Sequence, residues 1–165
     1  MFPDDLIARA THLLATCRAA GLRIAVAESC TGGLLSGVLT EIAGSSDVFE
    51  RGFITYSNAA KSGQLGVPKD LIADFGAVSE PVARAMAEGA LTYAQAEISA
   101  SVTGVAGPGG GTAMKPVGLV HFAVARKGQP TLHEVQSFGD LGRGTIRLLA
   151  VGRALALLQE QADRG

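Results

Sequence analysis

The chain has 165 residues, of which 47% are hydrophobic and 18% charged, which is the length and composition of one globular domain with an ordinary core. Its net charge of −1, without any run of Lys or Arg, argues against nucleic acid or an anionic membrane surface as a partner. No apolar stretch is long enough to span a membrane, the N-terminus lacks the features of a signal peptide, and the two cysteines lie in different apolar contexts, so we expect a reduced, cytoplasmic protein.

Helical and strand patterns alternate over the first half of the chain. Apolar residues at helical spacing predict helices, and short apolar runs rich in β-branched residues predict buried strands. Gly21 and Gly76 are the expected ends of two helices. In chain order, we predict a helix over 3–21, a strand over 22–27, a helix over 34–42, a strand over 51–57, and two short helices over 58–68 and 68–76.

The second half continues the alternation and adds a hairpin. Ser79 is a candidate N-cap and Pro81 lies in the first turn of the helix that follows it. The segment KGQP separates two apolar runs, as expected of a hairpin turn. In chain order, we predict a helix over 79–96, a strand over 97–104, a glycine-rich loop over 105–116, hairpin strands within 117–128 and 131–139, and a last helix from about Gly144.

This order of elements predicts the fold class. Helices alternate with apolar strands, and a single antiparallel hairpin comes late in the chain. The pattern is typical of an α/β protein, here a three-layer α/β/α sandwich with a mixed, mostly parallel sheet. Without a linker or an internal repeat, residues 1–165 are expected to form one domain.

The stretch AVAESCTGGLLSGVL, residues 25–39, places small polar side chains and two glycines between a strand and a helix. The first amides of a helix lack internal partners, so this junction is a candidate site for an anion or an oxyanion. Ser29, Thr31 and the amides of Gly32 and Gly33 would face that space. Alternatively, Thr31 only caps the helix and the glycines only make the turn.

Lys61 is one of four lysines and lies among small, uncharged residues, five positions after Tyr56. Without a carboxylate nearby in sequence, it is a candidate for burial. Use as a base near neutral pH requires that its pKa fall by about 3 units from an ordinary value of about 10.4, and burial can do this. The alternative is an exposed lysine on a helix.

Two further segments suit a phosphate. The glycines of VAGPGGGTAMKP permit close approach of the backbone to a ligand, although a flexible surface loop has the same composition. Arg143 and Arg147 lie one helical turn apart near a predicted helix start, where arginine can hold a phosphate with two hydrogen bonds or simply lie on an exposed face.

Histidines and cysteines do not form a metal-binding pattern. His121 and His133 are expected neighbours on the hairpin, but two histidines alone are a weak zinc signal. Cys30 is better explained as a small buried thiol than as a nucleophile, because no histidine stands beside it in sequence. We therefore expect no metal and no cofactor.

Five motifs stand in a fixed order along the chain: AESCTGG, GFITYSNAAKSGQLGV, GAVSEPVARAMAEGAL, VTGVAGPGGGTAMKPVG and FGDLGRGTIR. Together they resemble the C-terminal domain family of the competence/damage-inducible protein CinA, over about residues 6–158. That family includes stand-alone nicotinamide mononucleotide deamidases called PncC. Longer members carry an N-terminal nucleotide-hydrolysing domain, whose activity is not expected of this chain.

The resemblance implies an amidohydrolase that converts nicotinamide mononucleotide to nicotinic acid mononucleotide and ammonia. The implied catalytic set is Ser29, Tyr56 and Lys61: Ser29 is the nucleophile, Lys61 its base, and Tyr56 relays the proton or positions the lysine. The amides of Gly32 and Gly33 are the expected oxyanion donors. The resemblance also places a family threonine or serine on Thr103, and at the helix start we expect Thr31, Gly32 and Gly33 to contact substrate. We expect the phosphate to be held by loop amides at Gly109 and Gly110 and by either Arg143 or Arg147. Two residues inserted after Gly139-Asp140 leave both arginines as candidates.

The expected partner is thus a small mononucleotide. The low charged fraction leaves room for a subunit contact, so we also expect a homo-oligomer. The alternative functions are a non-catalytic nucleotide-binding regulatory module and a structural or recruitment domain. Only covalent catalysis needs both Ser29 and Lys61.

Overall fold

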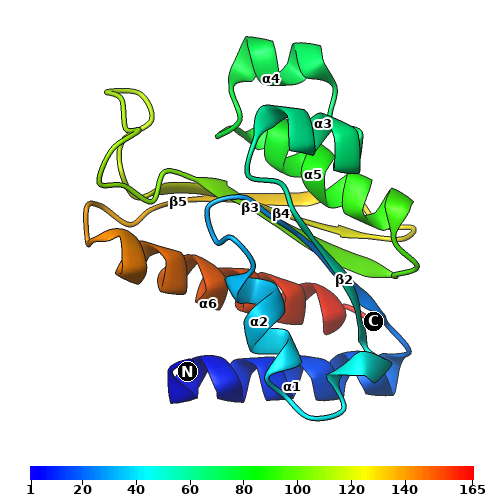
Figure 1. The fold of residues 1–165 in the computed structure, drawn as a ribbon. Coiled ribbons are helices and arrows are strands. Elements are labelled where there is room, and N and C mark those ends of the chain that lie inside the picture. Colours follow the sequence, from blue (N-terminus) through cyan, green and yellow to red (C-terminus); the bar gives the residue numbers. More distant parts are fainter.

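A mixed sheet of five strands lies between two groups of helices in the computed structural model, which describes residues 1–165 (Figure 1). The α/β/α sandwich predicted from the sequence is confirmed. In chain order the elements are α1 (Asp4–Ala20), β1 (Ile24–Glu28), α2 (Leu34–Thr40), the 3₁₀ turn η1 (Ser45–Asp47), β2 (Phe49–Ile54), α3 (Asn58–Leu65), α4 (Lys69–Phe75), α5 (Glu80–Tyr93), β3 (Ile98–Gly104), β4 (Leu119–Arg126), β5 (Leu132–Ser137) and α6 (Arg143–Ala162).

Four of the five strands run in the same direction. The spatial order is β2-β1-β3-β4-β5, with β1 parallel to both β2 and β3, and β4 antiparallel to both β3 and β5. The late hairpin expected from the sequence is the β4–β5 pair. The carboxyl ends of β1, β2, β3 and β5 therefore meet at one edge of the sheet.

The central strand β1 explains why helices cover both faces of the sheet. All five of its residues are buried. Ile24 and Val26 belong to the larger core, under α1, α2 and α6, whereas Ala25 and Ala27 belong to a second core under α3, α4 and α5. A strand that is apolar on both faces needs a layer on each side.

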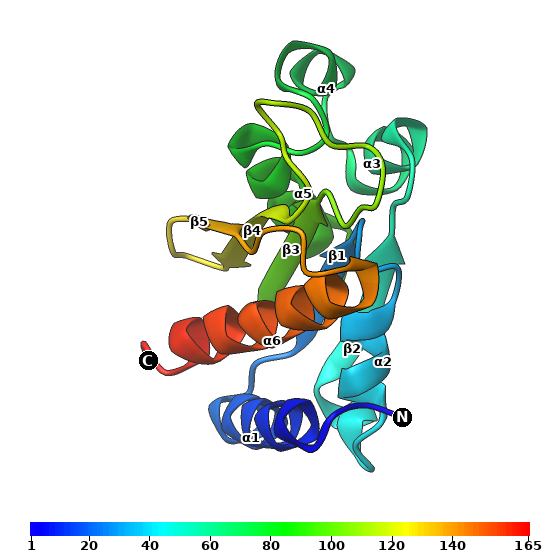
Figure 2. The same ribbon diagram turned by 90° about the vertical axis from the view of Figure 1, so that its left-hand side faces the viewer.

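The helices divide as the two cores require. In Figures 1 and 2, α6 and α2 lie on one side of the sheet with α1 beyond them, and α3, α4 and α5 lie on the other side. The glycine-rich loop between β3 and β4 lies on the side of α3 and α4, and Lys115 in this loop donates a hydrogen bond to the carbonyl of Phe75 at the end of α4.

Three side chains of β3 attach α5 and the segment before it to the sheet. The hydroxyls of Ser99 and Ser101 donate to carbonyl oxygens of α5, each at 2.6 Å. The hydroxyl of Thr103 donates to the carbonyl of Ala77 at 2.8 Å. These buried hydroxyls are fully used within the fold.

Candidate active site

A cleft of about 260 Å³ lies at the edge where the carboxyl ends of the four parallel strands meet. The chain leaves β1 toward β2 and later returns to β3 on the other side of β1, so the strand order reverses here. In open α/β sheets, ligands bind at such a point. The cleft is lined by Ser29, Cys30, Tyr56, Val78, Gly104, Val105, Ala106, Gly107, Gly109, Gly110 and Arg143.

Ser29 and Lys61 meet beside this cleft, although 32 positions separate them in sequence. Ser29 directly follows β1, and Lys61 lies on α3, whose N-cap Ser57 accepts a hydrogen bond from the amide of Ala60 at 3.0 Å. The Nζ atom of Lys61 lies 3.0 Å from Oγ of Ser29. A hydroxyl and an amine at this distance can exchange a proton.

The environment of Lys61 is unusual for a lysine. Its side chain is 2% exposed, and its second hydrogen-bond partner is the backbone carbonyl of Thr55, at 2.7 Å. Both partners are neutral oxygens, so no carboxylate stabilises a positive charge. Burial lowers the pKa of Lys61 below its ordinary value of 10.5.

Cys30 lies next to Ser29 but differs from it in reactivity. The thiol is 5% exposed, and burial raises its pKa to about 11. A thiol with this pKa remains protonated near neutral pH and is a poor nucleophile. The sequence-based interpretation of Cys30 as a small buried thiol is confirmed.

Tyr56 and Arg143 pair at the cleft. Nη2 of Arg143 donates to the Tyr56 hydroxyl at 2.7 Å, and Nη1 donates to the carbonyl of Gly107 at 2.7 Å. Tyr56 is 61% exposed and has no hydrogen bond with Lys61. The expected proton relay through Tyr56 is therefore absent from this arrangement, and the lysine is positioned by the carbonyl of the neighbouring Thr55 instead.

The expected oxyanion donors, Gly32 and Gly33, are occupied. The amide of Gly32 donates to the carbonyl of Ser29 at 3.0 Å, and the amide of Gly33 donates to the carboxylate of Glu28 at 3.1 Å. Thr31 is fully buried, and its hydroxyl does not line the cleft. The sequence placed an anion site at this helix start, but a carboxylate of the chain itself already fills it.

Of the remaining predicted contacts, Gly109 and Gly110 line the cleft, whereas Thr103 does not, since its hydroxyl is bound to Ala77. Arg147 also lies outside the cleft lining, with its guanidinium bound to the carbonyls of Cys30 and Thr31. Between the two candidate arginines, only Arg143 faces the cleft.

Sequence reasoning missed three features of this site: Glu28, Val78 and the free amides of the cleft wall. The amides of Cys30, Ala106 and Gly107 make no hydrogen bond within the chain. Glu28 had a detectable signal, because an acidic residue at the end of an apolar strand, just before a helix start, is a candidate helix cap. The free amides had none, because their partners depend on the assembled fold.

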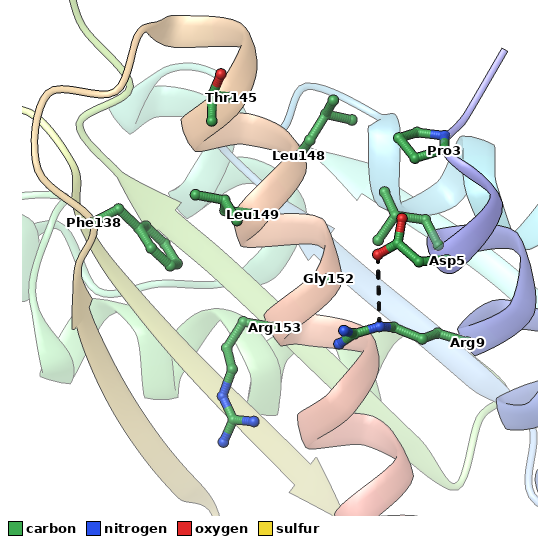
Figure 3. Close-up of a pocket in the computed structure, with 10 residues that line it drawn as sticks. Pro3, Asp5, Arg9, Phe138, Thr145, Leu148, Leu149, Gly152 and Arg153 are labelled. Atoms are coloured by element: carbon green, nitrogen blue, oxygen red, sulfur yellow. Dashed lines mark ion pairs between the residues drawn. The ribbon is translucent and has the colours of Figure 1, made fainter.

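A larger hollow lies elsewhere on the molecule and contains none of the predicted site residues. This groove, of about 430 Å³, runs between α1 and α6, with Leu148, Leu149 and Phe138 along it and an Asp5–Arg9 ion pair at 3.9 Å on its rim (Figure 3). It has no nucleophile paired with a base. The smaller cleft is therefore the candidate active site.

His121 and His133 are neighbours on the hairpin, as expected, with Nδ1 and Nε2 2.9 Å apart. Burial lowers the pKa of both. No cluster of three or more His, Cys, Asp or Glu side chains is arranged to hold a metal ion. None of the helices combines the length and apolar character that crossing a membrane requires.

Comparison with known proteins agrees with this architecture. A model of the family described as the CinA C-terminal domain matches residues 7–162. A CinA-like protein of Syntrophobacter fumaroxidans is 52% identical over 141 residues, which make up 86% of this chain and 33% of that protein. The chain spans about a third of the length of the curated relatives it matches.

Solved structures are similar over nearly the whole chain. A competence/damage inducible protein from Agrobacterium tumefaciens is 48% identical, with a TM-score of 0.96 over 99% of both chains. A competence-damaged protein (CinA) superfamily protein from Escherichia coli is 37% identical, with a TM-score of 0.90 over 97% of this chain and 94% of that one. On the family match and these similarities, the chain belongs to the CinA C-terminal domain family.

Proposed function

We propose that this chain is an amidohydrolase that releases ammonia from nicotinamide mononucleotide by way of an acyl-enzyme on Ser29. The observation that carries the proposal is the contact of 3.0 Å between the Ser29 hydroxyl and the amine of Lys61, which is buried without a carboxylate. A serine needs an adjacent base to become a nucleophile, and a neutral lysine is such a base. The mononucleotide is the substrate that the family resemblance implies.

In the first step, Ser29 Oγ attacks the carboxamide carbon while its proton moves to Lys61 Nζ. The protonated lysine then returns this proton to the nitrogen as the C–N bond breaks, so ammonia leaves and Ser29 carries an ester. A water molecule attacks the ester and gives its proton to Lys61, which returns it to Ser29. The carboxylic acid formed loses its proton to solvent, so the products are a carboxylate and the free enzyme.

The tetrahedral intermediates need hydrogen-bond donors for their oxyanion. Cys30, Ala106 and Gly107 line the cleft, and their amides, which make no hydrogen bond within the chain, are the proposed donors in place of those of Gly32 and Gly33. One such donor typically stabilises the transition state by about 3–4 kcal/mol. Arg143, at the same cleft, is the proposed contact for the phosphate, since a guanidinium binds phosphate with two parallel hydrogen bonds.

The test is ammonia release from nicotinamide mononucleotide by the wild type and by Ser29→Ala, Lys61→Ala and Lys127→Ala. Lys127 is a matched control because it is exposed and paired with Glu97 at 3.7 Å. We expect Lys61→Ala to lower kcat about 10²- to 10⁴-fold, Ser29→Ala to lower it at least as much, and Lys127→Ala to retain it. Wild-type protein that binds the nucleotide without releasing ammonia would instead support the non-catalytic regulatory module.

A further inference from the structure

The turn that carries the nucleophile, residues 29–33, contacts two charged side chains that take no part in the proposed reaction steps. The first is Glu28, which is fully buried. Its Oε2 atom accepts hydrogen bonds from the amides of Gly33 and Leu35, each at 3.1 Å. Its Oε1 atom accepts hydrogen bonds from both the amide and the hydroxyl of Ser36, each at 2.8 Å. The carboxylate thus binds the amide side of the turn and the start of α2.

The second is Arg147, which comes from α6, more than a hundred residues later in the chain. Its Nε donates to the carbonyl of Cys30 at 3.0 Å, and its Nη2 donates to the carbonyl of Thr31 at 3.1 Å. A Cβ atom added at Gly32 would lie 3.1 Å from Nη2, so the guanidinium lies directly against the turn. Arg147 thus binds the carbonyl side of the turn.

The turn needs such support because of its own composition. Gly32 and Gly33 have φ of 55° and 103°, in the region that only glycine enters readily, and glycine has the greatest freedom to leave a given conformation. Hydrogen bonds to a charged partner are about twice as strong as those between neutral groups. A carboxylate on one side and a guanidinium on the other therefore hold this turn in one conformation.

We propose that Glu28 and Arg147 form a clamp on the nucleophile turn and are positioning residues that keep Ser29 Oγ at its distance from Lys61 Nζ. The proposal rests on the proposed function. Displacement of a reacting group by about 1 Å can cost about 10² in rate, so the clamp acts on the chemical step and not on substrate binding. Arg147 is thereby assigned to the turn and not to a substrate phosphate.

The two roles of an arginine predict different kinetics. We expect Arg147→Met to lower kcat about 10²-fold with nicotinamide mononucleotide and with nicotinamide riboside, which lacks the phosphate, and to change KM little. For comparison, we expect Arg143→Met to raise KM for nicotinamide mononucleotide and to leave KM for nicotinamide riboside unchanged. Arg147→Lys keeps the positive charge but lacks the planar guanidinium with its two donor nitrogens, so it should recover part of the kcat that Arg147→Met loses.

Glu28→Gln tests the other half of the clamp. The four groups that contact Glu28 are all donors, and the amide NH₂ of glutamine would face some of them with another donor. We expect kcat to fall about 10²-fold with little change in KM, and the amides of Gly33, Leu35 and Ser36 to exchange hydrogen faster. Ser36→Ala removes one of the four hydrogen bonds and should give a smaller fall, which keeps the test open if Glu28→Gln does not fold.

The modification of Ser29 by a fluorophosphonate supplies a readout that does not depend on the substrate. Ser29 Oγ attacks phosphorus and displaces fluoride while its proton moves to Lys61 Nζ, so the rate reports how Ser29 and Lys61 are placed. Slower modification in Arg147→Met and Glu28→Gln, in parallel with a lower kcat, supports the clamp.

Wild-type rates of ammonia release and of Ser29 modification in both variants would overturn the clamp and leave the proposed amidase activity intact. A raised KM for the nucleotide in Arg147→Met, with riboside turnover unchanged, overturns it in favour of a phosphate ligand. A wild type that modifies Ser29 but releases no ammonia overturns the proposed function alone.

Discussion

The chemistry proposed for this chain depends on one buried amine. Lys61 is held between the carbonyl of Thr55 and the hydroxyl of Ser29, and neither partner carries a charge. A protonated lysine in this place would be a buried charge without a counter-ion, which the fold disfavours strongly. Burial lowers the pKa of Lys61, and the neutral amine that this favours is the form that can accept a proton from Ser29.

The pH dependence of activity and of stability should reveal this preference. Because only the neutral amine is a base, kcat/KM should rise with pH through a pKa below 10.5. The unfolded chain binds a proton at Lys61 more tightly than the folded chain, so this lysine's contribution to stability should also rise as the pH approaches 10.5. Urea unfolding of the wild type and of Lys61→Met, between about pH 6 and pH 10, checks this, since the wild type should gain stability relative to the variant. If the free energy of unfolding changed equally with pH in the wild type and in Lys61→Met, that result would contradict a lowered pKa of Lys61.

At the scale of elements, the position of Lys61 depends on how closely α3 approaches α5. Gly89 of α5 lies against the last turn of α3, where a Cβ atom would overlap the carbonyl of Leu65. Lys61 is one turn before Leu65 on the same helix. A glycine on α5 therefore allows the contact that places the lysine at Ser29.

We expect Gly89→Ala to move α3 away from α5, to lower the free energy of unfolding by about 1–3 kcal/mol and to lower kcat. Gly63→Ala is the matched control, since Gly63 lies on α3 with open space around it. That change should raise stability by about 0.5–1 kcal/mol, because alanine loses less backbone entropy in a helix, and should leave activity unchanged. Urea unfolding and ammonia release measure both, and a Gly89→Ala variant as stable as Gly63→Ala would refute the close contact.

At the scale of the whole molecule, four strands that run in the same direction bring the ends of distant segments to one edge. Ser29, Tyr56, Gly107 and Arg143 follow β1, β2, β3 and β5 respectively. The antiparallel strand β4 returns the chain so that β5 runs toward the same edge and α6, which follows β5, supplies both arginines. The cleft is thus a consequence of topology, with each segment contributing one or two groups.

The surface of the molecule suggests self-association. Phe75, Tyr93, Leu141 and Leu149 are between 40% and 55% exposed, in a chain with only 18% charged residues. We expect a homo-oligomer, because burying such side chains between subunits removes apolar area from water. Sedimentation equilibrium should give a mass at least twice that of one chain, and a single-chain mass across the concentration range would contradict this expectation.

Much of the fold could be predicted from local patterns. Hydrophobic spacing indicated the six α-helices and the five strands, and Gly21 and Gly76 marked the ends of α1 and α4. Strand boundaries were less accurate: the predicted strand over 51–57 is β2, at Phe49–Ile54. Local patterns work for elements because helix and strand periodicities act over a few residues, whereas a strand's ends depend on the length of its partner.

The sequence by itself determined which residue types were available at the site, and the family motifs directed attention to Ser29 and Lys61. Only the tertiary structure decided which groups were free to act. In the folded chain, the amides of Gly33, Leu35 and Ser36 donate hydrogen bonds to Glu28. Arg147 donates to the carbonyls of Cys30 and Thr31, and Arg143 lines the cleft. The physical reason is competition: each donor takes the acceptor that the packed fold brings nearest, and for Arg147 and Cys30 that acceptor lies 117 positions away.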